Sequence, residues 1–469
     1  MGKDMQPLRR GVLRWFAHRP ARIAVGSFLA LILVGAAVLC TPPCNPRDPV
    51  AGRRPWTHPA DALFTATSAV CVTGLVVKET GSQWSLFGQL VILLLIQMGA
   101  LGIMTLYAFL AAVILRRFSM RLERVVVDVV PAGPQEGVWS TVKFICLLTV
   151  VVELLGAGCL YLSWRGHFDG FWTCLYYSVF HAISAFCNAG FGLYSDSLIR
   201  YRGDVAVNLV ICALIVLGGL GFLVIRDLKD YLGWWLLVRR GKRPRLSTHS
   251  RLVLTVTGVL LLLGFVGLFI MESATSLRGA PLKEQVLAAV FQSVTARTAG
   301  FNTIDLSAGS IAPSTALLLI VLMFIGGSPG STAGGIKTTT LGVMIASILA
   351  TLRGADRAEV SHHSVPQVTV HRVASIILLS LTALLSVVFL LLATEKGEGF
   401  LQVAFESTSA FGTVGLSMGI TPRLTLWGRL ILPALMFIGR LGPITIVMST
   451  AAVAGRIPYR YPTDEILVG

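Results

Sequence analysis

The sequence predicts an all-α polytopic membrane protein made of four similar units with pseudo-fourfold symmetry. Three observations support this fold class. Hydrophobic residues make up 54% of the 469 residues and charged residues only 13%, against roughly 45–50% and about 25% in soluble domains. A short glycine-containing segment occurs four times at even spacing, and long and short apolar runs surround each copy in the same order.

The basic residues lie between the apolar runs. A net charge of +16 would suggest nucleic acid as the partner of a soluble protein, but here the clusters can all share one side of a membrane, as in the positive-inside pattern. The clusters comprise Arg9, Arg10, Arg14, Arg19 and Arg22; Arg116, Arg117, Arg121 and Arg124; Arg226, Lys229, Arg239, Arg240, Lys242, Arg243 and Arg245; and Arg353, Arg357, Arg372 and Arg456. We therefore expect a multi-pass protein of the bacterial cytoplasmic membrane with both termini in the cytoplasm, lipid contacts for some basic residues and no nucleic-acid partner.

Four segments resemble one another: SAVCVTGLVV (68–77), SAFCNAGFGL (184–193), TARTAGFNTI (295–304) and SAFGTVGLSM (409–418). Each has a glycine followed by a large apolar residue, and the glycines recur about every 110–116 residues, a period that suits a unit of several helices. Chance recurrence of small residues is the alternative, but the even spacing and shared context favour a repeat. The predicted units are residues 1–125, 126–247, 248–360 and 361–469.

Each unit contains a long, a short and a second long apolar run. In order, the runs are 24–40, 59–70 and 84–115; 138–162, 170–186 and 205–225; 251–271, 281–296 and 311–352; and 372–393, 399–411 and 426–454. The short runs hold roughly 12–17 residues, too few to cross a hydrocarbon core of about 30 Å. They must enter the membrane and return, which is tolerated only beside protein or water, so we expect the four short helices to converge on a wet axis.

The short helices favour a cation on that axis. Each has a carboxylate near its start, at Asp61, Asp169, Glu284 and Glu398, which suits the positive end of the helix dipole and leaves the partly negative end pointing inward. The glycine that follows each helix tolerates positive φ. A ring of backbone carbonyls could then replace the hydration shell of K⁺.

The predicted K⁺ filter comprises three residues from each unit. They are Val72, Thr73 and Gly74; Asn188, Ala189 and Gly190; Thr298, Ala299 and Gly300; and Thr413, Val414 and Gly415. The first position is polar in three units and Val72 in the other, so the predicted filter is only pseudo-fourfold.

The run 311–352 must break. As one helix its roughly 42 residues would extend about 63 Å, twice the core thickness. The segment GGSPGSTAGGIKTTT (326–340) marks the break, and unwound backbone at this depth requires an adjacent cavity. It is not a nucleotide-binding P-loop, because Ile336 separates Gly335 from Lys337.

The chain resembles the Trk, Ktr and HKT superfamily of K⁺ transporters over nearly all of its length. The motifs CVTGL, FCNAGF, ARTAGFNT, FGTVGLS, GGSPGSTAGGIKT and FIGRLGP carry the resemblance. Within that superfamily it looks most like KtrB-type membrane subunits, given its compact length, about 23 residues before the first span and the ending RYPTDEILVG.

The resemblance implies K⁺ uptake, commonly Na⁺-dependent, by a homodimer in which each protomer has its own pore. It also implies a cytosolic ring of KtrA-like RCK subunits that bind ATP or ADP, with no nucleotide bound by this chain. The implied gate lies beneath the filter: Gly326, Gly327, Ser328, Pro329, Gly330, Ser331, Thr332, Ala333, Gly334 and Gly335, with Arg440 facing it.

Three charged residues near the filter and gate have more than one interpretation. Arg440 lies deep in the last run, where a charge is a functional candidate by default; it could latch the closed gate or belong to a structural ion pair. We expect Arg297 to buttress the filter from behind, and Glu406 is the nearest obvious carboxylate in a short helix. Lys337 could simply extend toward the cytoplasm.

Other functions fit less well. A membrane-embedded enzyme would need clustered catalytic or ligand residues, whereas His362 and His363 lie in a loop and His181 lies alone in a short run. An alternating-access symporter is typified by inverted repeats, and these four run parallel. A Trk-type K⁺ symporter, the coupling of flux to Na⁺ or H⁺, and pairing of Cys40 with Cys44 remain open alternatives.

Overall fold

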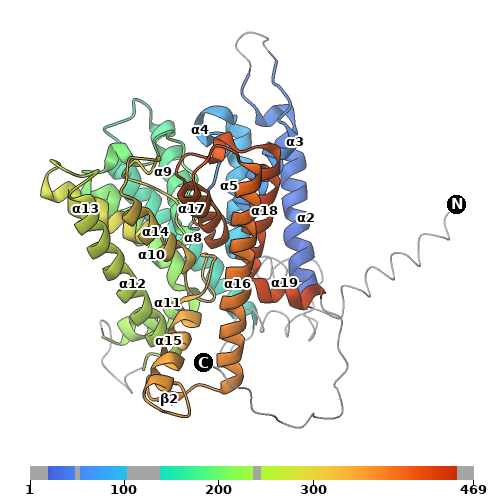
Figure 1. The fold of residues 1–469 in the computed structure, drawn as a ribbon. Helices are drawn as coiled ribbons and strands as arrows, with labels where there is room; N and C mark the ends of the chain where they lie inside the picture. Colours follow the sequence, from blue (N-terminus) through green and yellow to red (C-terminus); the bar gives the residue numbers. More distant parts are fainter. Residues whose placement is uncertain (1–19, 48–52, 103–137, 236–244, 451–469) are drawn as a thin grey trace.

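The computed structural model describes residues 20–47, 53–102, 138–235 and 245–450 (Figure 1). Within these residues the protein is helical apart from a short antiparallel hairpin, β1 (Glu359–Val360) and β2 (His363–Ser364), and a single bridge between Ile325 and Ile336. The prediction of an all-α membrane protein is confirmed.

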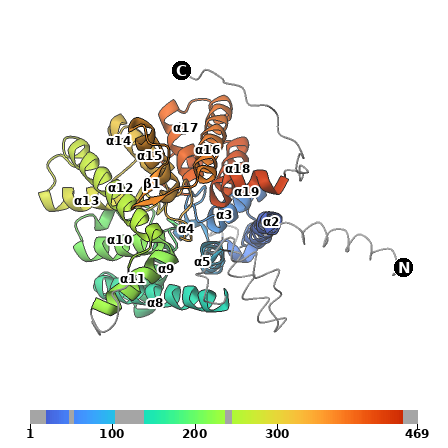
Figure 2. The same ribbon diagram turned by 90° about the horizontal axis from the view of Figure 1, so that it is seen from below.

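Each unit contributes a first membrane helix, a short pore helix and a second membrane helix. Unit 1 has α2 (Pro20–Cys40), α3 (Pro59–Val70) and α5 (Leu86–Leu101); unit 2 has α8 (Val138–Trp164), α9 (Phe171–Phe186) and α10 (Val205–Leu220); unit 3 has α12 (Thr248–Glu272), α13 (Leu282–Thr295) and α14 (Pro313–Phe324); unit 4 has α16 (Gln367–Thr394), α17 (Phe400–Gly412) and α18 (Leu426–Leu441). Figure 2 shows the four groups around a common centre. Further helices are α4 (Thr80–Gln83), α11 (Phe222–Gly233), α15 (Thr338–Leu352) and α19 (Pro443–Thr450), and 3₁₀ turns cover Pro42–Cys44, Ile199–Tyr201 and Thr421–Arg423.

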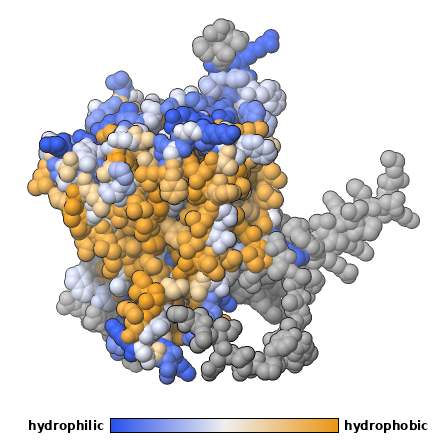
Figure 3. All heavy atoms as spheres, viewed as in Figure 1, coloured by the Kyte–Doolittle hydropathy of each residue, from blue (hydrophilic) through white to orange (hydrophobic). Residues whose placement is uncertain are grey.

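The surface of the bundle matches a membrane environment. Three described helices are long and apolar enough to cross a bilayer alone: Val142–Trp164, Thr248–Glu272 and Gln367–Thr394. On the face shown in Figure 3, an apolar belt lies between two more hydrophilic ends. The pore helices have 12, 16, 14 and 13 residues, so at about 1.5 Å per residue each is shorter than the bilayer core.

The second membrane helix breaks in every unit, although the sequence predicts a break only in 311–352. The continuous runs expected at 84–115, 205–225 and 426–454 end instead at Gly102, Gly221 and Gly442, which have φ of +74°, +88° and +82°. α10 and α11 meet at 107° across Gly221. A left-handed glycine ends a helix at little steric cost; the rest of the first run lies outside the described residues.

Glycines before these breaks bring the second membrane helices against the pore helices. A Cβ on Gly99 would lie 2.0 Å from the Val70 carbonyl oxygen, one on Gly218 would lie 2.0 Å from that of Phe186, and one on Gly439 would lie 1.8 Å from that of Phe411. No side chain fits at these contacts, so each glycine fixes the end of its pore helix.

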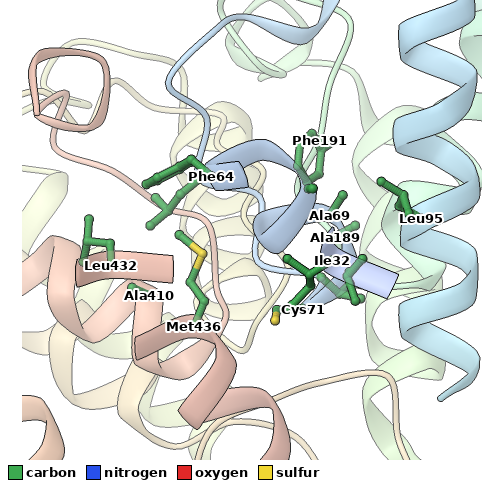
Figure 4. Close-up of a cluster of buried hydrophobic side chains, with 14 of the residues drawn as sticks. Ile32, Phe64, Ala69, Cys71, Leu95, Ala189, Phe191, Ala410, Leu432 and Met436 are labelled. Atoms are coloured by element: carbon green, nitrogen blue, oxygen red, sulfur yellow. The ribbon is translucent and has the colours of Figure 1, made fainter. Parts of the chain in front are cut away.

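The largest core is shared between units. Phe64 and Cys71 of unit 1, Phe191 of unit 2, and Leu432 and Met436 of unit 4 belong to one buried cluster (Figure 4). The pore helices are therefore held by apolar packing on their outer sides. This packing positions the segments that follow them.

Candidate ion pathway

The glycines of the four repeated segments form a closed ring at the centre of the bundle. A Cβ on Gly74 would lie 3.0 Å from the Cα of Gly190, and a Cβ on Gly190 would lie 2.9 Å from the Cα of Gly300. The corresponding distances are 3.2 Å from Gly300 to Gly415 and 3.1 Å from Gly415 to Gly74. Each unit thus touches the next, in chain order, and the fourth touches the first.

Each ring segment alternates its backbone conformation. Val72, Asn188, Thr298 and Thr413 have φ of 57°, 59°, 77° and 50°, and the glycine two residues later is also left-handed in every unit, at 89°, 69°, 83° and 94°. A left-handed backbone is unfavourable for residues other than glycine. Because the non-glycine member of the pair is strained in all four units, the surrounding structure must impose this conformation.

The backbone N–H groups of the ring are bound on the pore-helix side. Thr73 and Ala189 donate to the carbonyls of Ser68 and Ser184, each at 2.7 Å. Ala299 and Val414 make the equivalent bonds, to Thr295 at 2.9 Å and to Ser409 at 2.8 Å.

The same four Ser and Thr residues also hold the ring through their hydroxyls, a role that the sequence analysis missed. Ser68 Oγ accepts from Gly74 N–H at 3.1 Å, and Ser409 Oγ accepts from Gly415 N–H at 3.0 Å. Ser184 Oγ donates to the Phe191 carbonyl at 2.7 Å, and Thr295 Oγ1 donates to the Phe301 carbonyl at 2.6 Å.

Several ring side chains have buried oxygens without a protein partner. The hydroxyls of Thr73, Thr298 and Thr413 and the Oδ1 of Asn188 make no hydrogen bond among the described residues. Buried polar atoms normally have partners, so an ion or a water molecule would suit these oxygens. Hard oxygen donors of this kind suit a dehydrated alkali cation better than an apolar ligand.

A cavity of 300 Å³ lies over the ring, and all four glycines line it. Asp305, Glu79 and Tyr194 also line this vestibule. Asp305 accepts hydrogen bonds from the Ser307 hydroxyl and backbone N–H and from the Ser310 hydroxyl. The bonds from Ser307 hold the pKa of Asp305 below its usual value, so the carboxylate stays charged at the mouth.

Each pore helix contains a buried polar residue directly after a buried phenylalanine. The pairs are Phe64–Thr65, Phe180–His181, Phe291–Gln292 and Phe405–Glu406, and all eight side chains are buried. His181 Nε2 accepts from Leu193 N–H at 3.4 Å. Glu406 Oε1 accepts from the hydroxyls of Ser417, at 3.2 Å, and Thr421.

The carboxylates predicted at the pore-helix starts are held largely by ion pairs. Asp61 lies 2.7 Å from Arg429, Glu284 lies 2.9 Å from Arg202 and Glu398 lies 3.3 Å from Arg423. Asp169 is exposed. Cys40 and Cys44 are free thiols, and no group of three or more His, Cys, Asp or Glu residues that could hold a metal occurs in the described part of the chain.

The glycine-rich break between α14 and α15 passes directly under the ring. It is fixed to unit 2, because Ser328 N–H donates to the Gly219 carbonyl at 3.1 Å and Thr332 N–H donates to that of Gly218 at 3.2 Å. Asn188 Nδ2 of the ring donates to Thr332 Oγ1 at 2.9 Å. A Cβ on Gly334 would lie 2.1 Å from Thr413 Oγ1 of the ring on unit 4.

Two arginines contact the backbone of this segment. Arg440 donates to the Thr332 carbonyl and, at 2.7 Å, to the Gly99 carbonyl of unit 1. Arg297 Nη2 donates to the Gly326 carbonyl, at the start of the break, at 2.9 Å. Glu406, the nearest carboxylate candidate from the sequence, instead accepts a hydrogen bond from Ser417. Lys337 Nζ turns back to the Ala333 carbonyl at 2.6 Å, which contradicts the expectation that it extends toward the cytoplasm.

Comparison with known proteins shows similarity to cation transport proteins. Residues 52–455 match the TrkH family model, described as cation transport protein. The chain is 38% identical to the potassium/sodium uptake protein NtpJ of Enterococcus hirae, over 96% of this chain and 97% of that protein. It is also 38% identical to the Ktr system potassium uptake protein B of Bacillus subtilis, over 98% of each.

A solved structure shares the fold. The potassium transporter TrkH from Vibrio parahaemolyticus superposes with a TM-score of 0.68 at 18% identity, over 91% of this chain and 83% of that one. The matching proteins are transporters, and an enzymatic role is not supported. The chain therefore belongs to the TrkH family of cation transport proteins.

Proposed function

We propose that this protein takes up K⁺ through the ring of Gly74, Gly190, Gly300 and Gly415. The carrying observation is that the ring closes on itself while its N–H groups are bound on the pore-helix side. A dehydrated monovalent cation would be coordinated by the ring carbonyls, with the unpaired side-chain oxygens close by. The names of the similar Ktr proteins, which refer to potassium uptake, support K⁺ as the ion.

The segment Gly326–Gly335 acts as the gate in this proposal, with Arg440 as its latch. Its contacts with Asn188 and Thr413 place it against the inner side of the ring. Arg440 adds a positive charge there, which opposes the passage of K⁺ as long as the segment stays in place. Movement of the segment away from unit 2 would open the path.

The wider assembly is proposed by analogy with the Ktr relatives. We propose that a cytosolic nucleotide-binding RCK ring moves the gate, that the membrane protein is a homodimer, that uptake depends on Na⁺, and that both termini are cytoplasmic. The phrase "Ktr system" in the names of the similar proteins supports a separate regulatory component. The three boundaries between the four units, at residues 125, 247 and 360, are part of the same proposal.

Paired glycine substitutions test the filter. Gly300→Ser places a Cβ 2.5 Å from the Val414 carbonyl oxygen, whereas Gly309→Ser, at a similar positive φ of 89°, places it in open space. Both variants carry the left-handed strain of about 1–2 kcal/mol, but only Gly300→Ser deforms the ring. We expect Gly300→Ser to lower the preference for K⁺ over Na⁺ and Gly309→Ser to preserve it.

The measurement is Rb⁺ uptake in a K⁺-transport-deficient bacterial strain, with increasing Na⁺ as competitor. Protein level in the membrane is measured for both variants. If Gly300→Ser is inserted normally and retains the wild-type selectivity, the ring is not the filter.

A further inference from the structure

A second cavity, outside the ion path, lies between α12 and α15. Its volume is 550 Å³, and its walls are almost entirely apolar, with Val259, Leu263, Ile345 and Leu349 among the lining residues. These four side chains are 51%, 58%, 45% and 43% exposed, so the groove opens outward. On a membrane protein, exposed apolar surface of this kind faces lipid acyl chains.

One end of the groove is basic. Arg353, which caps α15, and Arg357, just before β1, both line it and are exposed. Neither side chain makes an ion pair or hydrogen bond within the described residues. Glu359 is the one carboxylate in the lining, and Asp356 does not line the groove.

The order of these features matches an amphipathic ligand. The apolar walls continue the apolar belt toward the hydrophilic end of the molecule, where α15 and the hairpin lie (Figures 1 and 3). An acyl chain fits the walls, and guanidinium groups bind phosphate oxygens well because their donors form a planar fork. An anionic headgroup would supply the further negative charge that two arginines beside the single lining carboxylate, Glu359, still need.

We propose that this groove binds an anionic phospholipid, with an acyl chain between α12 and α15 and its phosphate at Arg353 and Arg357. The groove is linked to the proposed gate, because α15, which forms one wall of the groove, begins directly after the gate segment. Thr338 N–H donates to the Gly327 carbonyl at 3.0 Å, and Thr338 Oγ1 donates to Ser328 Oγ at 3.1 Å. A bound lipid therefore restrains α15 and, where the proposed gate is correct, the gate segment as well.

The test measures lipid binding to the full-length protein in detergent by native mass spectrometry. Phosphatidylglycerol is titrated against phosphatidylcholine with the same acyl chains. At about 1 kcal/mol per arginine, Arg353→Gln or Arg357→Gln should weaken phosphatidylglycerol binding about fivefold and the double variant about 25-fold. Arg372→Gln, an exposed arginine on α16 outside the groove, should have no effect.

Two further arms test the acyl chain and the occupant. Ala346→Trp fills the groove and should weaken binding of both lipids. Soluble glycerophosphoglycerol, the headgroup without chains, should fail to compete. The proposal is wrong if the double arginine variant binds phosphatidylglycerol as the wild type does, if the soluble headgroup competes fully, or if Ala346→Trp instead abolishes a concentration-dependent dimer without changing lipid binding.

These experiments measure lipid binding and do not involve ion flux. Lipid binding could therefore still be measured if the selectivity test disproved the proposed filter. Conversely, loss of lipid selectivity would leave the proposed filter untouched, so the two proposals fail separately.

Discussion

Removal of the Arg440 side chain should release the gate. Its guanidinium bonds two carbonyls, of Thr332 in the gate segment and of Gly99 in unit 1. Hydrogen bonds to charged groups contribute about 1.5–3 kcal/mol each. Only the bond to Thr332 is lost when the segment moves, so Arg440→Ala should shift the equilibrium toward the displaced segment by about 10- to 150-fold.

A graded series sharpens this prediction. Lysine keeps the charge but cannot reproduce the two-carbonyl fork, glutamine keeps a neutral donor, and alanine keeps neither. We expect flux without any cytosolic subunit to rise in the order wild type, Arg440→Lys, Arg440→Gln, Arg440→Ala. The assay is Rb⁺ uptake into proteoliposomes of the purified protein, normalised to the amount inserted.

Arg429→Ala is the matched control, because Arg429 lies on the same helix α18 and bonds Asp61 and the Leu424 carbonyl, away from the gate. It should lower the thermal unfolding midpoint without raising flux. If Arg440→Ala unfolds at a temperature near that of the wild type yet carries no more Rb⁺, Arg440 does not latch the gate, and a structural role explains its contacts.

Two further predictions concern carboxylates near the ring. Glu406→Ala removes the acceptor of the half-buried Ser417 hydroxyl and of the buried Thr421 hydroxyl, which should cost about 1–3 kcal/mol and lower the thermal unfolding midpoint more than Glu406→Gln does; equal midpoints would show that these bonds contribute little. The pKa of Asp305 is lowered, so its stabilising charge is present above the usual value of 3.8 and is lost only as pH falls through the lower folded value. Asp305→Asn should therefore slow Rb⁺ uptake about twofold at low salt, equally at about pH 5 and pH 8; an effect confined to one of these pH values would contradict the assignment.

The pore helices were predictable because their ends are coded locally. The first is predicted and observed at Pro59–Val70, where Pro59 suits the first turn and Asp61 suits the helix dipole. The glycine of each ring segment was likewise readable, because positive φ has few alternatives to glycine. Both signals lie within a dozen residues of the feature they specify.

The helix ends at Gly102, Gly221 and Gly442 were not predicted, because the apolar residues continue beyond each glycine. Hydropathy alone does not show where a helix stops or bends. A local signal existed: the sequences GALG (99–102), GGLG (218–221) and GRLG (439–442) precede the breaks. The hydroxyls that hold the ring were also within reach, since each of the four aligned segments begins with Ser or Thr.

The partners of Arg297 and Lys337 could not be predicted, because both are backbone carbonyls, which every residue has. Arg297 bonds the Gly326 carbonyl, 29 residues away, and Lys337 turns back on Ala333. Burial makes a backbone carbonyl an adequate partner where a carboxylate was the obvious candidate. A search for opposite charges in the sequence would miss both contacts.

The departures from fourfold symmetry are consistent with a single unit, unit 3, supplying the proposed gate. The GALG, GGLG and GRLG sequences have Ala100, Gly219 and Arg440 at the same position. The proposed gate segment from unit 3 lies on the backbone of unit 2, where Ser328 N–H donates to the Gly219 carbonyl at 3.1 Å. Its opposite side faces unit 4, where Arg440 reaches Thr332. Backbone hydrogen bonds from unit 2 and the long cation of unit 4 thus hold one asymmetric segment beneath a pseudo-fourfold ring.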